Sequence, residues 1–181
     1  MTAGRWLVIG LLAGSLATGC GGDDAGGSSS ATEWADGVCS AITTWSESIT
    51  STADSLRGGN LTEEELRSAV DDVESATSEF VDDLRGLGEP DTEAGDKAKE
   101  SLDQLSRNVE ENVSKMKSAV DDASGVSGIV EAATAVSASL STMGEQLSST
   151  FAELKQLDPG GELERAFSEA DSCDELESGG S

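Results

Sequence analysis

Residues 61–87 read LTEEELRSAVDDVESATSEFVDDLRGL, and this stretch carries the clearest helical pattern in the chain. Thr62 and Glu65 have the spacing of a capping box, in which each side chain bonds the backbone N–H of the other residue. Leu61 and Leu66 are placed as the hydrophobic staple that often accompanies such a cap. The sequence therefore predicts a helix that begins directly after Thr62.

The apolar positions of this stretch recur in alternating steps of four and three, which is the pattern of a heptad seam packed against other helices. Thr77 is the one polar residue on the seam. The seam positions are Leu66, Val70, Val73, Thr77, Phe80, Leu84 and Leu87.

Three other stretches have the same rhythm and predict three more long helices. The first of these helices covers 32–57 and ends before the Gly-Gly-Asn sequence at 58–60. The second starts from a cap at Asp91 or Thr92, and the third ends before Pro159. Their apolar positions are Trp34, Val38, Ala41, Ile42, Trp45, Ile49 and Leu56 in the first, Ala98, Leu102, Leu105, Val109, Met116, Ala119 and Ala123 in the next, and Ile129, Ala133, Val136, Leu140, Met143, Leu147, Phe151 and Leu154 in the last.

Asn112 falls on the seam of the helix that starts near Thr92. A buried Asn that fixes helix register is favoured over an Asn that contacts a ligand.

A short fifth helix is expected near the C-terminus, with its apolar side formed by Leu163, Phe167, Ala170, Cys173 and Leu176. Four long amphipathic helices joined by short turns predict an all-α, antiparallel up-down four-helix bundle. We expect one domain over 32–176 and a disordered tail over 177–181.

The chain has 181 residues, a net charge of −25 and no histidine. Nucleic acids and anionic lipid headgroups are bound through basic patches, so this composition argues against both as partners. A Ser-His-Asp triad or a zinc site containing histidine is excluded. Acidic pairs such as Asp71-Asp72 diverge by about 100° on a helix and do not converge on one ion. We expect no enzymatic activity, no cofactor and no metal.

Residues 6–17 form an apolar run behind Arg5. The run is shorter than the roughly 20 residues of a transmembrane helix and fits a secretory signal. The end of the run and the residues after it, Leu16 to Cys20, resemble the lipobox of bacterial lipoproteins, although Ala17 stands where such signals usually carry Leu and Leu16 lies one place earlier. The resemblance implies a signal peptide over 1–19 and a diacylglyceryl group on Cys20, which becomes the first residue.

The alternative is an ordinary secretory signal that leaves Cys20 as a free thiol. Two acyl chains anchor a protein stably, whereas one gives only marginal membrane binding. The Gly- and Ser-rich residues 20–31 then form a flexible linker, and the domain is expected on the outer face of the cytoplasmic membrane.

Cys39 and Cys173 remain as an even pair in an exported domain, which favours a disulfide. At 1.5 Å per residue, the fifth helix brings Cys173 to about the height of Cys39. The spacing Trp-x4-Cys-x5-Trp at 34–45, with a late second cysteine, resembles small helical envelope lipoproteins of actinobacteria. This resemblance implies no activity.

Two function classes remain open: a structural or interaction module for an envelope partner, and a carrier of a small apolar ligand in the bundle core. The small seam residues favour a narrow, filled core and hence the interaction module, because a carrier generally needs about 300 Å³ or more. The linker enters at one end of the bundle, so the turns at 58–60 and 125–128 are expected at the opposite end, which faces away from the membrane. Leu61, Val126 and Ser127 are the candidate contacts there, although the staple competes for Leu61.

Overall fold

The computed structural model describes residues 30–57 and 61–179, and this part of the chain is folded almost entirely into six helices. The helices are α1 (Ala31–Arg57), α2 (Glu63–Gly86), α3 (Gly95–Asp121), α4 (Gly125–Gln156), α5 (Glu162–Glu169) and α6 (Asp171–Gly179). The predicted all-α class is confirmed. The expected signal peptide, the lipidation site Cys20 and the linker up to residue 29 lie outside the described residues. Among the helices described, none has the length and apolar character needed to cross a membrane.

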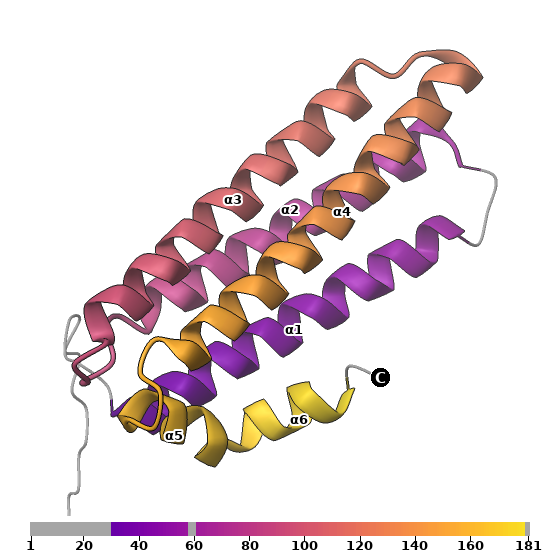
Figure 1. Ribbon diagram of the computed structural model, residues 1–181. Helices are drawn as coiled ribbons and strands as arrows, with labels where there is room; N and C mark the ends of the chain where they lie inside the picture. Colours follow the sequence, from indigo (N-terminus) through magenta and orange to yellow (C-terminus); the bar gives the residue numbers. More distant parts are fainter. Residues whose placement is uncertain (1–29, 58–60, 180–181) are drawn as a thin grey trace, which may run out of the picture.

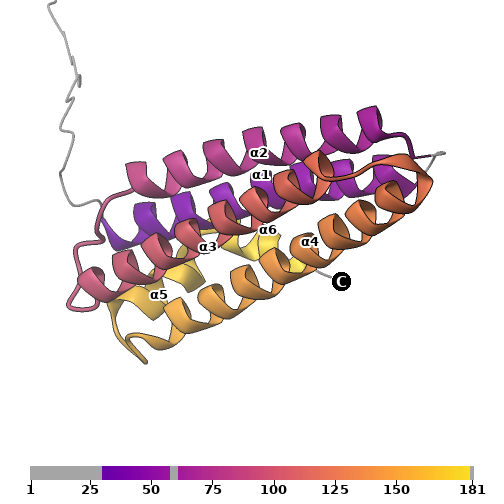
Figure 2. The same ribbon diagram turned by 90° about the horizontal axis from the view of Figure 1, so that it is seen from above.

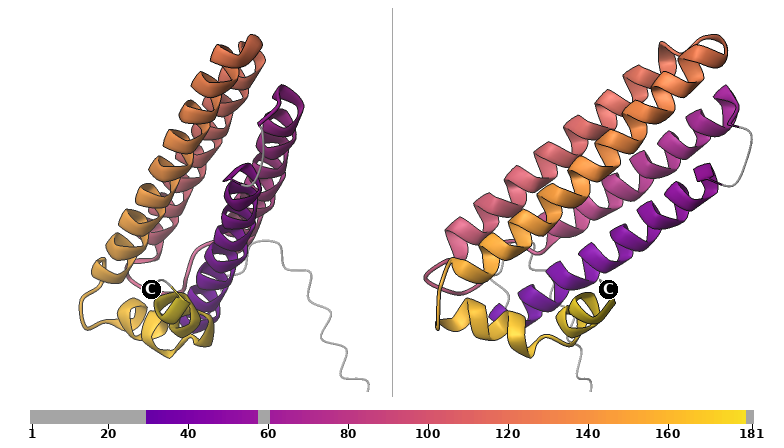
Figure 3. Two further views of the ribbon diagram at one scale, coloured as in Figure 1. Left: turned by 90° about the vertical axis from the view of Figure 1, so that its right-hand side faces the viewer. Right: turned by 45° about the vertical axis from the view of Figure 1, so that its right-hand side comes forward.

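The four long helices lie side by side as two hairpins, α1 with α2 and α3 with α4 (Figures 1 and 2). Extensive packing of α2 against α3 joins the hairpins, whereas α1 and α4 meet through few residues. The right-hand view of Figure 3 shows α1 close to α4 near α5 and farther from it toward the end that holds the α3–α4 turn. At the opposite end, α5 and α6 pack against α1. We call the end with α5 the base and the end with the α3–α4 turn the tip.

The predicted seam of α2 is buried from Leu66 to Leu84, and Leu87 at its end is half-buried. Thr77, the polar residue on that seam, is 2 % exposed and accepts a hydrogen bond from the indole Nε1 of Trp45 on α1 at 3.2 Å. The interruption of the heptad pattern is therefore a polar partner for a buried tryptophan.

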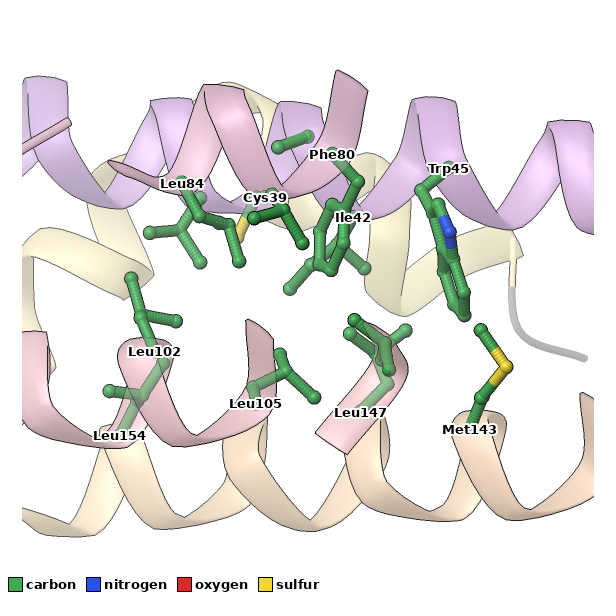
Figure 4. Packing of buried hydrophobic residues seen from close by; sticks show 14 of the residues in the cluster. Cys39, Ile42, Trp45, Phe80, Leu84, Leu102, Leu105, Met143, Leu147 and Leu154 are labelled. Atoms are coloured by element: carbon green, nitrogen blue, oxygen red, sulfur yellow. The ribbon is translucent and has the colours of Figure 1, made fainter. Parts of the chain in front are cut away.

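Trp45 is the central contact between helices in the middle of the molecule. Its ring stacks on Phe80 of α2, with 5.2 Å between centroids and 27° between planes. Figure 4 shows the indole pointing from α1 toward Met143 of α4. One side chain thus bonds α2 and fills space between the two hairpins.

A second aromatic cluster holds the base together. Phe167 of α5 makes edge contacts with Trp34 of α1 at 5.9 Å and with Phe151 of α4 at 5.6 Å. The indole Nε1 of Trp34 donates to the carbonyl oxygen of Gly88, which ties the α2–α3 turn to the start of α1. The base is therefore held by contacts among four parts of the chain: α1, the α2–α3 turn, α4 and α5.

Asn112 is 5 % exposed, as the register interpretation predicts. Its Nδ2 donates to the backbone oxygen of Asn108 at 2.8 Å and to Oε1 of Gln146 on α4 at 3.1 Å. A slip of α4 along α3 would break the second bond and leave a buried amide without that partner, so this pair fixes their register.

Helix α3 begins later than the expected caps at Asp91 or Thr92. Residues 90–95 form a tight turn instead, in which the Thr92 N–H donates to the Pro90 carbonyl and the Gly95 N–H donates to the Thr92 carbonyl. A Cβ on Gly95 would lie 2.3 Å from the Pro90 oxygen, so this turn requires glycine.

The expected single fifth helix is two helices, because the backbone is extended at Ala170 (ψ 119°). The break lets α6 start anew, and Asp36 of α1 caps it by accepting the Ser172 N–H at 3.1 Å. Helix α6 runs on to Gly179, into the segment 177–181 that the sequence analysis assigns to a tail.

Replacing Thr77 by Val tests the role of the Trp45–Thr77 bond. The substitution keeps the shape of the side chain but leaves the indole N–H buried without its acceptor. We expect a loss of about 1–3 kcal/mol in the free energy of unfolding, measured with denaturant.

Thr77→Ser, which retains the hydroxyl, is expected to lose less stability than Thr77→Val. Thr134 is exposed on α4, so Thr134→Val is the control for replacing a threonine by a valine away from the core. If Thr77→Val is as stable as the unmodified protein, the hydrogen bond does not contribute to the fold.

Candidate functional site

Cys39 on α1 and Cys173 on α6 lie at disulfide distance, as the sequence predicts, with their Cα atoms 5.0 Å apart across 134 residues of chain. Both side chains are buried, at 0 % and 2 % exposure. Because the pair is enclosed and cross-linked, it serves the structure rather than presenting a reactive thiol. The described residues contain no cluster of three or more His, Cys, Asp or Glu side chains suited to a metal ion.

The disulfide joins α6 covalently to α1, the helix against which α6 also packs. Of the α6 side chains that can be described, Cys173 is buried and Leu176 is half-buried. Ser172 is also half-buried, and its N–H donates to the Asp36 carboxylate. The cross-link therefore holds the C-terminal helix against α1.

The tip carries the most exposed large apolar side chains of the described chain, Val126 at 81 % and Val130 at 60 %. Residues 125–128 form the first turn of α4 rather than the loop expected from the sequence, because the connection after α3 is limited to 122–124. Val126 and Val130 are four residues apart on a helix and therefore share a face. We call Val126, Ser127 and Val130 the tip patch.

Leu61 lies at the same end of the molecule but on the other hairpin, just before α2. It is half-buried and lines a small cavity of about 230 Å³ together with Leu56 and Ala69. Leu61 is therefore less accessible to a partner than Val126, which is 81 % exposed. The sequence did not single out Val130, because it lies off the apolar seam of α4. The sequence signal that could have identified it is a valine at a position that the seam leaves facing away from the other helices.

The tip patch differs in charge from the rest of the surface. Glu131 is the only charged residue between Gly125 and Gly144, on a chain with a net charge of −25. Nearby, Arg67 pairs with Glu63 at 3.0 Å and with Asp121 at 3.9 Å, which links the start of α2 to the end of α3.

The capping box at the start of α2 is formed as the sequence predicts. The Glu65 N–H donates to the Thr62 hydroxyl at 3.2 Å, and the Thr62 N–H donates to the Glu65 carboxylate at 2.9 Å. The bond from the Thr62 hydroxyl, followed by the bond from its backbone, lowers the pKa of Glu65 below its ordinary value of 4.5. The cap therefore favours the ionised carboxylate.

Comparison with protein-family models, curated proteins and solved structures finds no match to this chain. The functional argument accordingly depends on the residues and their geometry.

We expect Cys39→Ala/Cys173→Ala to unfold at lower denaturant concentration than the oxidised protein. The long closed loop sets the expected loss at about 2–5 kcal/mol. Hydrogen exchange measures the local effect, and protection should fall most in α6. Two free thiols in the alkylated, non-reduced protein would contradict the assignment.

Glu65→Ala should reveal the pH dependence of the cap. Because the folded-state pKa of Glu65 is lowered, its stabilising contribution is present above the unfolded-state value and is lost as the pH falls through the folded-state value. The melting temperature of Glu65→Ala should lie below that of the unmodified protein at pH 7, and the difference should shrink as the pH falls below the ordinary glutamate pKa of 4.5. Glu64→Ala, which removes a carboxylate outside the capping box, is the control. A difference that stays constant with pH would contradict the capping role of the carboxylate.

Proposed function

We propose that this protein is a lipid-anchored, extracytoplasmic lipoprotein that serves as a non-enzymatic interaction or structural module of a bacterial cell envelope. In this proposal Cys20 carries the lipid, and the domain is an antiparallel up-down four-helix bundle on the outer face of the cytoplasmic membrane. The partner is another envelope protein, and the membrane is contacted through the lipid alone.

The observation that carries the proposal is the exposure of Val126 and Val130 at the tip. Exposed apolar side chains that gather on one face mark contact sites more often than singly scattered ones do. The low charge of this part of α4 reduces the electrostatic repulsion and the desolvation cost that a partner meets there.

The position of the tip relative to the anchor supports the same assignment. Helix α1 begins at the base, at Ala31, beside α5. Helix α4 has 32 residues and so spans about 48 Å from base to tip. An anchor that enters at the base therefore leaves the tip patch directed away from the membrane.

The carrier of an apolar ligand is the second candidate, and the packing of the core argues against it. Large side chains from all four long helices fill the axis, among them Phe80, Leu105, Met143 and Leu154, each 2 % exposed or less (Figure 4). A ligand of ordinary size would have to displace several of them.

A photo-crosslinking residue placed at Ser127 tests the proposal in intact cells, with the same residue at Glu89 near the base as its position control. We expect a protein adduct from Ser127 that is stronger than any adduct from Glu89. Val130→Ser, combined with the Ser127 probe, should weaken the adduct several-fold because it removes apolar contact area.

Equal or absent crosslinking from the two positions would contradict the tip as a contact surface. A lipid that co-purifies with the delipidated domain would favour the carrier instead.

A further inference from the structure

A polar groove of about 570 Å³ lies between the base-side halves of α3 and α4, which run side by side in Figure 2. Its volume falls within the range of about 300–1,000 Å³ typical of small-molecule sites. Every residue that lines it is polar or charged except Leu157. The side chains that matter most are Glu100, Ser101, Gln104, Asn108, Gln146 and Glu153.

Two amide groups in the groove are held in fixed orientations through their oxygens. Oε1 of Gln146 accepts from the buried Asn112, and Oδ1 of Asn108 accepts from Nε2 of Gln104 at 2.8 Å. Oε1 of Gln104 in turn accepts from Arg107 at 3.0 Å. With these oxygens engaged, the amide nitrogens of Gln146 and Asn108 are hydrogen-bond donors at the groove wall.

The same groove offers acceptors and hydroxyl groups close to these donors. The Glu153 carboxylate accepts from the Ser101 hydroxyl at 3.4 Å and has further lone pairs available. Glu100 adds a second carboxylate, and Lys97 is the cation in the lining. Donors and acceptors are therefore interleaved across the two helices.

The interleaved hydrogen-bond donors and acceptors of the groove favour one chemical class of ligand. A hydroxyl group donates one hydrogen bond and accepts two, so a polyhydroxylated molecule satisfies both kinds of group at once. The two carboxylates disfavour an anion, and the single apolar lining residue gives little to an apolar ligand.

We propose that the α3–α4 groove binds a neutral saccharide, with Asn108 and Gln146 as hydrogen-bond donors and Glu153 as an acceptor. Asn112 is a positioning residue that holds the Gln146 amide from behind. The groove lies at the base end of α3 and α4, so this site is separate from the tip patch and its failure would leave the tip proposal untouched.

The test is a nuclear magnetic resonance titration of the full chain, followed through the side-chain amide signals of Asn108 and Gln146. The probes are the neutral tetrasaccharides maltotetraose and chitotetraose, together with a sulfated tetrasaccharide. We expect at least one neutral probe to shift both amide signals and the sulfated probe to leave them unchanged.

Gln146→Glu and Asn108→Asp are the matched variants, because each keeps the oxygen that accepts the internal hydrogen bond and replaces the amide donor with an oxygen. Each should weaken binding of the responsive sugar at least fivefold. Gln156→Glu makes the same change on α4 outside the groove and should bind as the unmodified protein does. Thermal unfolding of each variant shows that the fold is retained.

Retention of the protein on an insoluble polymer of N-acetylglucosamine, lost in Gln146→Glu, would identify an extended glycan as the source of the sugar; binding of the soluble tetrasaccharides without such retention would identify free oligosaccharides. The proposal is overturned if neither amide responds to any probe and the polymer does not retain the protein. It is also overturned if Gln146→Glu binds as tightly as the unmodified protein.

Discussion

The contact between Trp45 and α2 is the interaction on which the arrangement of the helices depends. The chain has few aromatic residues, so each large ring must fill a space that aliphatic side chains leave open. Trp45 stacks on Phe80, bonds Thr77 and faces Met143, and it thereby joins α1 to α2 and helps α4 to pack over them. The two hairpins are joined mainly by the packing of α2 against α3, and Trp45 lies at one of the few places where α1 approaches α4.

The features that could be predicted from the sequence are those set by local periodicity. The α2 seam, the capping box at Thr62 and the buried Asn112 all follow from spacing along one helix, and the structure contains each of them. The pairing of Cys39 with Cys173 could be predicted because only two cysteines remain in the domain and helix rise brings them level.

The features that could not be predicted depend on contacts between distant parts of the chain. The break at Ala170 follows from the need to bring Cys173 to α1, where Asp36 caps the new helix. Gly95 begins α3 because the Pro90 carbonyl leaves no room for a Cβ. Val130 is 60 % exposed at the tip, and periodicity within α4 alone does not show which residues off its seam are left uncovered by the other helices.

The central claim is that a lipid on Cys20 holds the base toward the membrane and leaves the tip patch free to meet a partner. The most direct test is the intact mass, with fragmentation of the N-terminal peptide, of the protein extracted from the membranes of its native cells. The account predicts a chain that begins at Cys20 and carries a diacylglyceryl group on its sulfur. A chain that begins elsewhere, or an unmodified Cys20 thiol, would contradict it.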